Sequence, residues 1–442
     1  MLTRSARAAA LLISVAGCGQ SGTAFGAFVA DDMAEAPPDM ATGGPTLDPG
    51  VVSRSARSAI EAETHVAAAP NGFVALAWIA EQANGASNNG YVFSKDDGAT
   101  FEPVDTLASP GGRVSSDPVL TVDRAGNFWL TWIGFKRTNQ GQTADMHVYV
   151  AEAPAGTTKF GTPNEVSVNI GGAEQYDKPW ITVVNDGALL VTYARTSTGG
   201  ILAARSMDGI NWDTVVIVED GGFRNLVFPC VAAGGSTVYA TYHSGGGIGL
   251  RRSDDNGATW PDANKLAVAD RNEGQPAFDD PTCAADGDQV WVAYGITSEQ
   301  FNPSAATSAK LDSVRLAHSP DRGANIDGRY DAQDAAAGRY FLHPYLVRED
   351  NGALDIAYYA GASEGDRAGS FRRARSTDGG MTWGASAHVG SALTYTVSRA
   401  SQAWLGDYTG TWWARNNLYY AFTTNAGGSG HVAFYRTASP TN

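Results

Sequence analysis

Positive charge is scarce in this sequence. Its 442 residues contain 31 lysines and arginines against 46 aspartates and glutamates, a formal net charge of −15. Nucleic-acid binding relies on clustered basic side chains, so this balance excludes DNA and RNA as expected partners. Charged residues of both signs make up only 17% of the chain, whereas hydrophobic residues make up 43%. The composition is that of a globular protein and not of a disordered one.

Long hydrophobic runs are also missing, and no segment is long enough to cross a bilayer. A short apolar run, Ala8–Val15, follows Arg4 and Arg7 and leads into Val15-Ala16-Gly17-Cys18. Residues 1–17 therefore predict a secretory signal, and the last four residues resemble a bacterial lipobox. We expect Cys18 to be lipidated and the exported chain to reach the membrane through this lipid anchor alone. An ordinary signal peptide with a cysteine at its cleavage site is the alternative.

Cysteine is rare, with three in the whole chain. Besides Cys18 these are Cys230 and Cys283, each of which closely follows a proline in one of two neighbouring repeat units. An exported protein meets an oxidising compartment in which a disulfide persists. The two residues either form a disulfide or remain buried thiols, and the sequence leaves both open.

Glycine and aromatic residues are abundant, with 52 glycines and 11 tryptophans, and they recur in a pattern. Residues 18–50 predict a flexible tether, and after it seven segments share a turn residue followed by an alternating apolar run that ends in an aromatic ring. The segments are Gly72–Trp78, Gly126–Trp132, Gly187–Tyr193, Gly235–Tyr242, Gly287–Tyr294, Gly352–Tyr358 and Asn416–Phe422. Their spacing suits four-stranded antiparallel sheets, so residues 51–442 predict one all-β domain, a β-propeller with seven blades. Residues Val51–Ile60 are expected to complete the last blade.

An octet recurs after the third strand of several units. It reads SKDDGATF at Ser94–Phe101, SDDNGATW at Ser253–Trp260 and STDGGMTW at Ser376–Trp383. The aspartate can accept hydrogen bonds from the N–H groups of its own turn, glycine can adopt a left-handed φ, and the ring can pack between sheets. We therefore assign the octet a structural role, carried by Ser94, Asp96, Gly98, Ser253, Asp255, Gly257, Ser376, Asp378 and Gly380.

This octet resembles the Asp-box, or BNR repeat, and with seven hairpins the chain resembles the sialidase superfamily, whose members have six blades. The resemblance implies an exo-sialidase site with three arginines on the substrate carboxylate, a Tyr–Glu nucleophile pair and an Asp acid. Tyr408 is spaced from its turn like the nucleophile, and Arg372 stands where a clamp arginine could lie. Phe228 and His243 occupy positions where the family has a glutamate and an arginine. The implied activity is a glycoside hydrolase; a polysaccharide lyase and a non-catalytic binding propeller are the alternatives.

A second candidate site does not depend on the family. Polar residues stand where the innermost strand of several units begins, next to the expected central channel: Asp117, Asp177, Asp280, His343 and Asp407. If they share one rim, they could bind a cation such as calcium, provide an acid of raised pKa or hold a sugar. Alternatively, the carboxylates only shape the turns. Trp180, Tyr345, Trp404, Trp412 and Trp413 would be sugar-stacking planes or core. We expect a monomer that needs no cofactor and that binds a glycan or another extracellular ligand.

Overall fold

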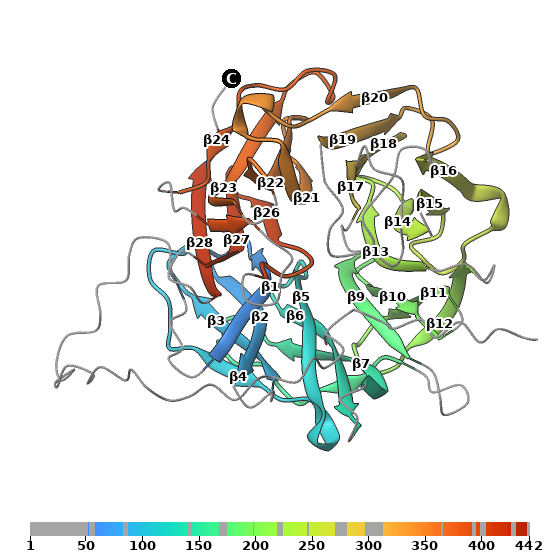
Figure 1. Ribbon diagram of the computed structural model, residues 1–442. Helices are drawn as coiled ribbons and strands as arrows, with labels where there is room; N and C mark the ends of the chain where they lie inside the picture. Colours follow the sequence, from blue (N-terminus) through green and yellow to red (C-terminus); the bar gives the residue numbers. More distant parts are fainter. Residues whose placement is uncertain are drawn as a thin grey trace, which may run out of the picture.

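The apolar runs form β-strands in seven antiparallel sheets that follow one another around a ring (Figure 1). This computed structural model describes residues 52, 58–82, 87–138, 143–167, 175–197, 199–218, 224–244, 247–269, 281–296, 313–363, 366–390, 395–397, 404–425 and 430–439. The signal, the tether and Cys18 lie outside these residues. Three short 3₁₀ turns, at Pro110–Gly112, Asp262–Asn264 and Ala335–Ala337, are the helical elements of the described part.

Each blade runs outward from its innermost strand in chain order. The strands are β1 (Ser58–Ala68), β2 (Val74–Gln82), β3 (Ser87–Ser94) and β4 (Asp105–Leu107) in blade 1; β5 (Val114–Val122), β6 (Phe128–Arg137), β7 (Thr143–Ala153) and β8 (Asn164–Glu165) in blade 2; β9 (Tyr176–Val183), β10 (Leu189–Arg195), β11 (Gly200–Ser206) and β12 (Asp213–Val218) in blade 3; β13 (Arg224–Val231), β14 (Val238–Ser244), β15 (Ile248–Ser253) and β16 (Lys265–Ala269) in blade 4; β17 (Thr282–Asp286), β18 (Gln289–Ile296), β19 (Ser313–Ser319) and β20 (Gly328–Asp331) in blade 5; β21 (Tyr340–Arg348), β22 (Leu354–Gly361), β23 (Asp366–Ser376) and β24 (Ala387–His388), with β25 (Tyr395–Val397) also paired to β23, in blade 6; and β26 (Gly410–Ala414), β27 (Asn417–Thr424) and β28 (His431–Ala438) in blade 7.

The ring closes between the last blade and the first. Each innermost strand contacts the next one, and β26 contacts β1. On the outside of blade 7, the N–H of Val52 donates to the carbonyl of Val432 in β28 at 2.8 Å. The seven predicted blades are thus confirmed, and Val52 lies where the sequence places the closing strand. Ser58–Ile60, which the sequence assigns to that closing segment, instead begins β1.

The core lies between neighbouring blades. Because each sheet packs on a blade at both faces, its second strand is buried on both sides, and the large rings of these strands are solvent-free: Trp78, Trp132, Tyr193, Tyr242, Tyr294 and Tyr358. Buried threonines add hydrogen bonds between blades. Thr192 Oγ1 donates to the Val227 carbonyl, and Thr282 Oγ1 donates to the Pro344 carbonyl. Apolar packing between neighbouring sheets, together with these hydrogen bonds, therefore holds the ring together.

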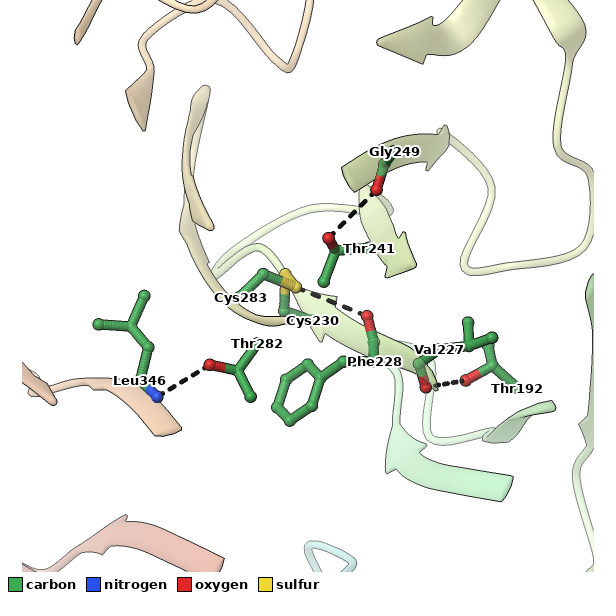
Figure 2. The surroundings of a disulfide bond; sticks show 9 residues. All are labelled: Thr192, Val227, Phe228, Cys230, Thr241, Gly249, Thr282, Cys283 and Leu346. Atoms are coloured by element: carbon green, nitrogen blue, oxygen red, sulfur yellow. Dashed lines mark hydrogen bonds between the residues drawn. A yellow bond between two sulfur atoms is a disulfide. The ribbon is translucent and has the colours of Figure 1, made fainter. Parts of the chain in front are cut away.

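A disulfide joins two blades at the inner ring. Cys230 in β13 and Cys283 in β17 are bonded, with Cα atoms 5.7 Å apart and a sequence separation of 53 (Figure 2). Both residues are buried. Of the two alternatives that the sequence leaves open, the structure shows the disulfide, and the bond fixes blade 4 to blade 5.

The repeated octets form turns at the end of the third strand, as predicted. In the first octet, Asp96 accepts hydrogen bonds from the Thr100 N–H at 2.8 Å and the Thr100 hydroxyl at 2.6 Å. These bonds lower the pKa of Asp96 to about 2. The ring of Phe101 packs edge-on to Phe434 of blade 7, with centroids 5.1 Å apart. Equivalent hydrogen bonds occur in the octets at Ser253 and Ser376.

The position of the octets distinguishes the end of the blades where the innermost strands begin from the end where they finish. The N–H of Asp97 donates to the carbonyl of Gly72, in the turn between β1 and β2. The octets therefore lie at the end where the innermost strands finish, opposite the end where they begin. In the described part of the chain, no helix has the length and apolarity needed to cross a membrane.

Candidate functional site at the centre of the ring

The innermost strands of four blades carry a backbone bulge near their start. At each bulge one non-glycine residue has a left-handed conformation: Glu63 (φ 52°), Asp117 (φ 54°), Lys178 (φ 49°) and His343 (φ 54°). The pairing register with the second strand shifts at each of these places. Left-handed backbone costs roughly 1 kcal/mol or more for such residues, and this strain is concentrated at functional sites. The shared bulge gives four different side chains equivalent places in the ring.

Two of the other bulge side chains and one side chain from blade 7 contact Lys178. Its ammonium nitrogen Nζ lies 3.0 Å from Glu63 Oε1, 2.6 Å from Asp117 Oδ1 and 2.7 Å from Asp407 Oδ2. Asp177, the neighbour of Lys178, accepts the Lys178 backbone N–H at 2.9 Å. We call Glu63, Asp117, Asp177, Lys178 and Asp407 the central cluster. It joins blades 1, 2, 3 and 7 through one buried cation.

The central cluster holds four carboxyl groups and one ammonium, a combination that cannot be buried fully ionised without a large electrostatic cost. Burial, reinforced by the charge of Asp117, raises the pKa of Asp177 to about 7. The same causes raise the pKa of Glu63 well above its ordinary value. Asp177 therefore binds a proton near neutral pH, and burial shifts the pKa of Glu63 in the same direction. The cluster thus combines an acid of raised pKa, Asp177, with Asp407, which is ion-paired to Lys178.

Aromatic side chains surround this cluster. The ring of Trp180 lies 4.7 Å from Phe228, 5.1 Å from Tyr408, 5.4 Å from His65 and 6.2 Å from Tyr345, measured between centroids. We call these five residues the aromatic group. Lys178 Nζ lies 5.7 Å from the centroid of Tyr408, which connects the group to the central cluster.

All residues of the central cluster and the aromatic group are buried, but their exposed fractions differ. Asp407 is 8% exposed, Phe228 7%, and Trp180 and Tyr345 5% each, whereas Glu63 and Asp117 are fully buried. Asp407 is thus the most accessible carboxyl of the central cluster, and three rings of the aromatic group share this partial access. The largest exposed fractions among these residues thus belong to one carboxyl group and three aromatic side chains.

Close backbone packing brings Asp407 to this position. A Cβ atom on Gly406 would lie 2.5 Å from the backbone nitrogen of Glu63, and one on Gly410 would lie 2.7 Å from the Cα of His65. Only glycine allows the chain around the start of β26 to approach β1 this closely. The indole N–H of Trp404 lies 3.4 Å from Asp407 Oδ1 and helps to orient the carboxylate.

The structure brings together several of the predicted site residues. Asp117, Asp177, Asp407, Tyr408, Trp180 and Tyr345 all belong to the central cluster or the aromatic group. The Tyr408 hydroxyl donates to the Pro118 carbonyl at 3.1 Å. His343 occupies the equivalent bulge in blade 6 and lies against Tyr359. Asp280 lies outside the described residues.

Other predicted residues lie elsewhere. Arg372 turns to the outer part of blade 6, where its guanidinium donates to the hydroxyl and carbonyl of Ser386, so it is not part of a clamp at the ring centre. His243 is buried near the end of β14. Trp412 and Trp413 are partly buried and pack against apolar core clusters.

Sequence reasoning missed Glu63, Lys178 and His65. The sequence comparison of blades equates Asp177 with Asp117, but the bulges show that Lys178 is the equivalent residue. The sequence does contain a signal that Lys178 and Asp117 are equivalent, because each residue directly precedes a proline. Glu63 precedes a threonine, so its sequence carries no such signal.

A bound calcium ion stays a prediction. Within the described residues, no three His, Cys, Asp or Glu side chains are arranged to hold a metal ion. In the central cluster the ammonium of Lys178 supplies the positive charge between carboxyl groups.

Solved structures with the same architecture are numerous. The endosialidase of phage phi92 aligns with a TM-score of 0.50 and 11% identity, over 87% of this chain and 69% of its own. The GH93 α-L-arabinofuranosidase of Fusarium graminearum, solved with arabinobiose, gives a TM-score of 0.50 and 11% identity over 86% of this chain and 93% of its own. The fold is that of a sialidase-like β-propeller. No protein-family model and no curated protein matches the sequence of this propeller.

The protonated acids predict that mild acid stabilises the propeller. A carboxyl whose pKa rises on folding binds more protons in the native state, so stability falls as pH rises from the unfolded to the native pKa. For Asp177, with a native pKa of about 7, acidification from pH 8 to pH 5.5 should add about 2 kcal/mol. The buried Asp355, whose pKa burial also raises to about 7, should add a similar amount.

His65 acts in the opposite direction, because burial lowers its pKa to about 3 and the unfolded histidine gains a proton over this range. The measurement is therefore a difference between variants. Chemical unfolding at pH 8 and pH 5.5 should show that Asp177→Asn loses about 2 kcal/mol of the acid stabilisation of the wild type. An equal pH response in both proteins would contradict the assignment.

Proposed function

We propose that this propeller hydrolyses neutral glycosides at the centre of its ring, with Asp407 as the carboxylate that faces the substrate and the more deeply buried Asp177 as the acid of raised pKa that supplies a proton to the site. The observation that carries the proposal is the pair of carboxyls beside Lys178. Asp177 has a pKa raised to about 7 by burial and by Asp117, whereas Asp407 is ion-paired to Lys178 at 2.7 Å. Glycoside hydrolysis uses one carboxyl as an acid and a second as a carboxylate, and Asp177 and Asp407 are our candidates for these two roles.

The charge of the site favours a neutral sugar over a sialic acid. The three arginines that the sialidase resemblance implies would hold a substrate carboxylate, but the described residues place only one cation, Lys178, in the central cluster. Arg373 pairs with Asp355 and Arg375 with Glu349, both on blade 6. A site with four carboxyl groups and one cation disfavours an anionic sugar, and Trp180, Tyr345 and Phe228, which keep 5–7% exposure, are the rings on which an uncharged sugar would stack.

The test is a panel of neutral 4-nitrophenyl glycosides, including the α-L-arabinofuranoside, with a fluorogenic sialoside as the charged comparator. Turnover of a neutral glycoside is expected, and Asp407→Asn and Asp177→Asn should each lower kcat by roughly 100-fold or more. Asp355→Asn is the matched control, because it removes another buried carboxyl of raised pKa and should leave kcat unchanged. Hydrolysis of the sialoside alone, or full activity of Asp407→Asn, would overturn the proposal.

A non-catalytic ligand-binding propeller is the second candidate. It is favoured by the burial of Glu63, Asp117 and Asp177, which are at most 1% exposed, because a ligand then contacts Asp407 and the rings alone. This candidate predicts retention of a glycan on an array with no product released from the panel.

We also propose that the chain is exported and anchored through a lipid on Cys18. The Cys230–Cys283 disulfide supports export, because disulfides persist in oxidising compartments. Metabolic labelling with a palmitate analogue should mark the wild type and leave Cys18→Ser unlabelled; labelling of both would contradict the anchor.

A further inference from the structure

The hydrogen bonds of His65 identify which of its nitrogens carries the proton. Its Nδ1 accepts the backbone N–H of Leu120 in β5 at 3.2 Å, and its Nε2 lies 3.2 Å from the hydroxyl of Tyr345 in β21. Burial lowers the pKa of His65 to about 3, so the ring is neutral and has one donor and one acceptor. Because Nδ1 is the acceptor, Nε2 donates to Tyr345 Oη.

This assignment leaves the Tyr345 proton for another acceptor. The hydroxyl of Tyr345 already accepts a hydrogen bond from His65. Among the described residues, His65 is its hydrogen-bonding partner. Tyr345 keeps 5% exposure. Its ring lies 5.5 Å from Phe228 and 6.2 Å from Trp180, so packing fixes the orientation of the phenol. A buried hydroxyl group whose proton has no acceptor in the protein normally donates it to water or to a ligand.

We infer that Tyr345, oriented by His65, is a specificity-determining hydrogen-bond donor for a hydroxyl or ring oxygen of the neutral saccharide bound at the ring centre. The inference rests on the proposed function for the class of ligand. Trp180 and Phe228 would cover the apolar face of the sugar, while Tyr345 Oη donates to one oxygen at its edge. Such a donor distinguishes a sugar with an acceptor at that position from its deoxy analogue, because loss of the acceptor leaves the donor unpaired.

The experiment compares Tyr345→Phe, which keeps the ring, with wild type by titration calorimetry against arabinobiose, lactose and cellobiose. For a disaccharide that binds the wild type, Tyr345→Phe should raise the dissociation constant roughly 5- to 20-fold. Tyr420→Phe is the control, because it removes another buried hydroxyl, one that donates to Asp355, and should leave binding unchanged. Equal binding by wild type and Tyr345→Phe would overturn the inference and leave the proposed function standing.

A second measurement needs no sugar. Nitrogen-15 NMR of His65 should show a neutral ring with its proton on Nε2 from pH 8 to pH 5. A proton on Nδ1, or titration within this range, would overturn the donor assignment even if sugars bind. Failure of every neutral sugar to bind, with His65 as assigned, would instead count against the proposed function and this inference together.

Discussion

Replacement of Lys178 by methionine is expected to destabilise the propeller by roughly 3–5 kcal/mol, the range seen when one partner of a buried ion pair is removed. The side chain is 2% exposed and contacts three carboxyl groups at 3.0 Å or less. Methionine keeps most of the volume but removes the only cation that the described residues provide in the central cluster. The carboxyls can then respond only by binding protons or by moving apart.

The measurement is chemical unfolding followed by tryptophan fluorescence, for which the nearby Trp180 is a reporter. Lys95→Met is the matched control, because Lys95 also forms an ion pair, with Glu102 at 2.6 Å, but its side chain is 53% exposed. Exposed pairs contribute at most about 1 kcal/mol, so the control should change little. Acidification should also recover more stability in Lys178→Met than in wild type, since protonation removes the repulsion. Equal stability of the two lysine variants would contradict a structural role for Lys178.

Loss of the Cys230–Cys283 disulfide is expected to cost about 2–4 kcal/mol. The bond joins the innermost strands of blades 4 and 5 (Figure 2), and its cysteines lie 53 positions apart in sequence. A crosslink over this length restricts the unfolded chain, and in the native state it holds two blades at the ring centre. Because β13 and β17 also pack on the strands beside them, reduction should weaken the ring without abolishing the fold.

Thermal unfolding with and without a reductant measures this contribution. The double variant Cys230→Ser/Cys283→Ser should melt at the lower temperature of the reduced wild type and should not respond to the reductant. A double variant as stable as the oxidised wild type would show that packing between blades 4 and 5 alone holds the ring there.

Much of the fold follows from local patterns in the sequence. The alternation that ends in Trp78, Trp132 or Tyr193 predicts the second strand of a blade, because a sheet covered on both faces needs large apolar side chains at regular intervals. The octets predict turns for an equally local reason. The serine, the aspartate and the threonine of each octet bond to one another and to their own backbone, so the sequence contains every partner.

Local sequence patterns predict only part of the candidate site. Prolines after Asp117 and His343 indicate strand starts near the ring centre, and both residues lie at bulges of innermost strands, in β5 and β21. The identity of the central cation was not predicted. A bulge shifts the register by one residue, so that Lys178 and not Asp177 occupies the place equivalent to Asp117.

The sequence by itself determined the repeated unit, the number of blades and the structural role of the octets, because the interactions that specify them are local or repeat with the chain. Only the tertiary structure decided that Lys178 of blade 3 pairs with Glu63, Asp117 and Asp407 of blades 1, 2 and 7, and that His65 orients Tyr345 of blade 6. These contacts join residues as far as 280 positions apart. Ring closure creates them, and the pKa values of Glu63, Asp177 and His65 follow from the burial and the neighbouring charges that closure imposes.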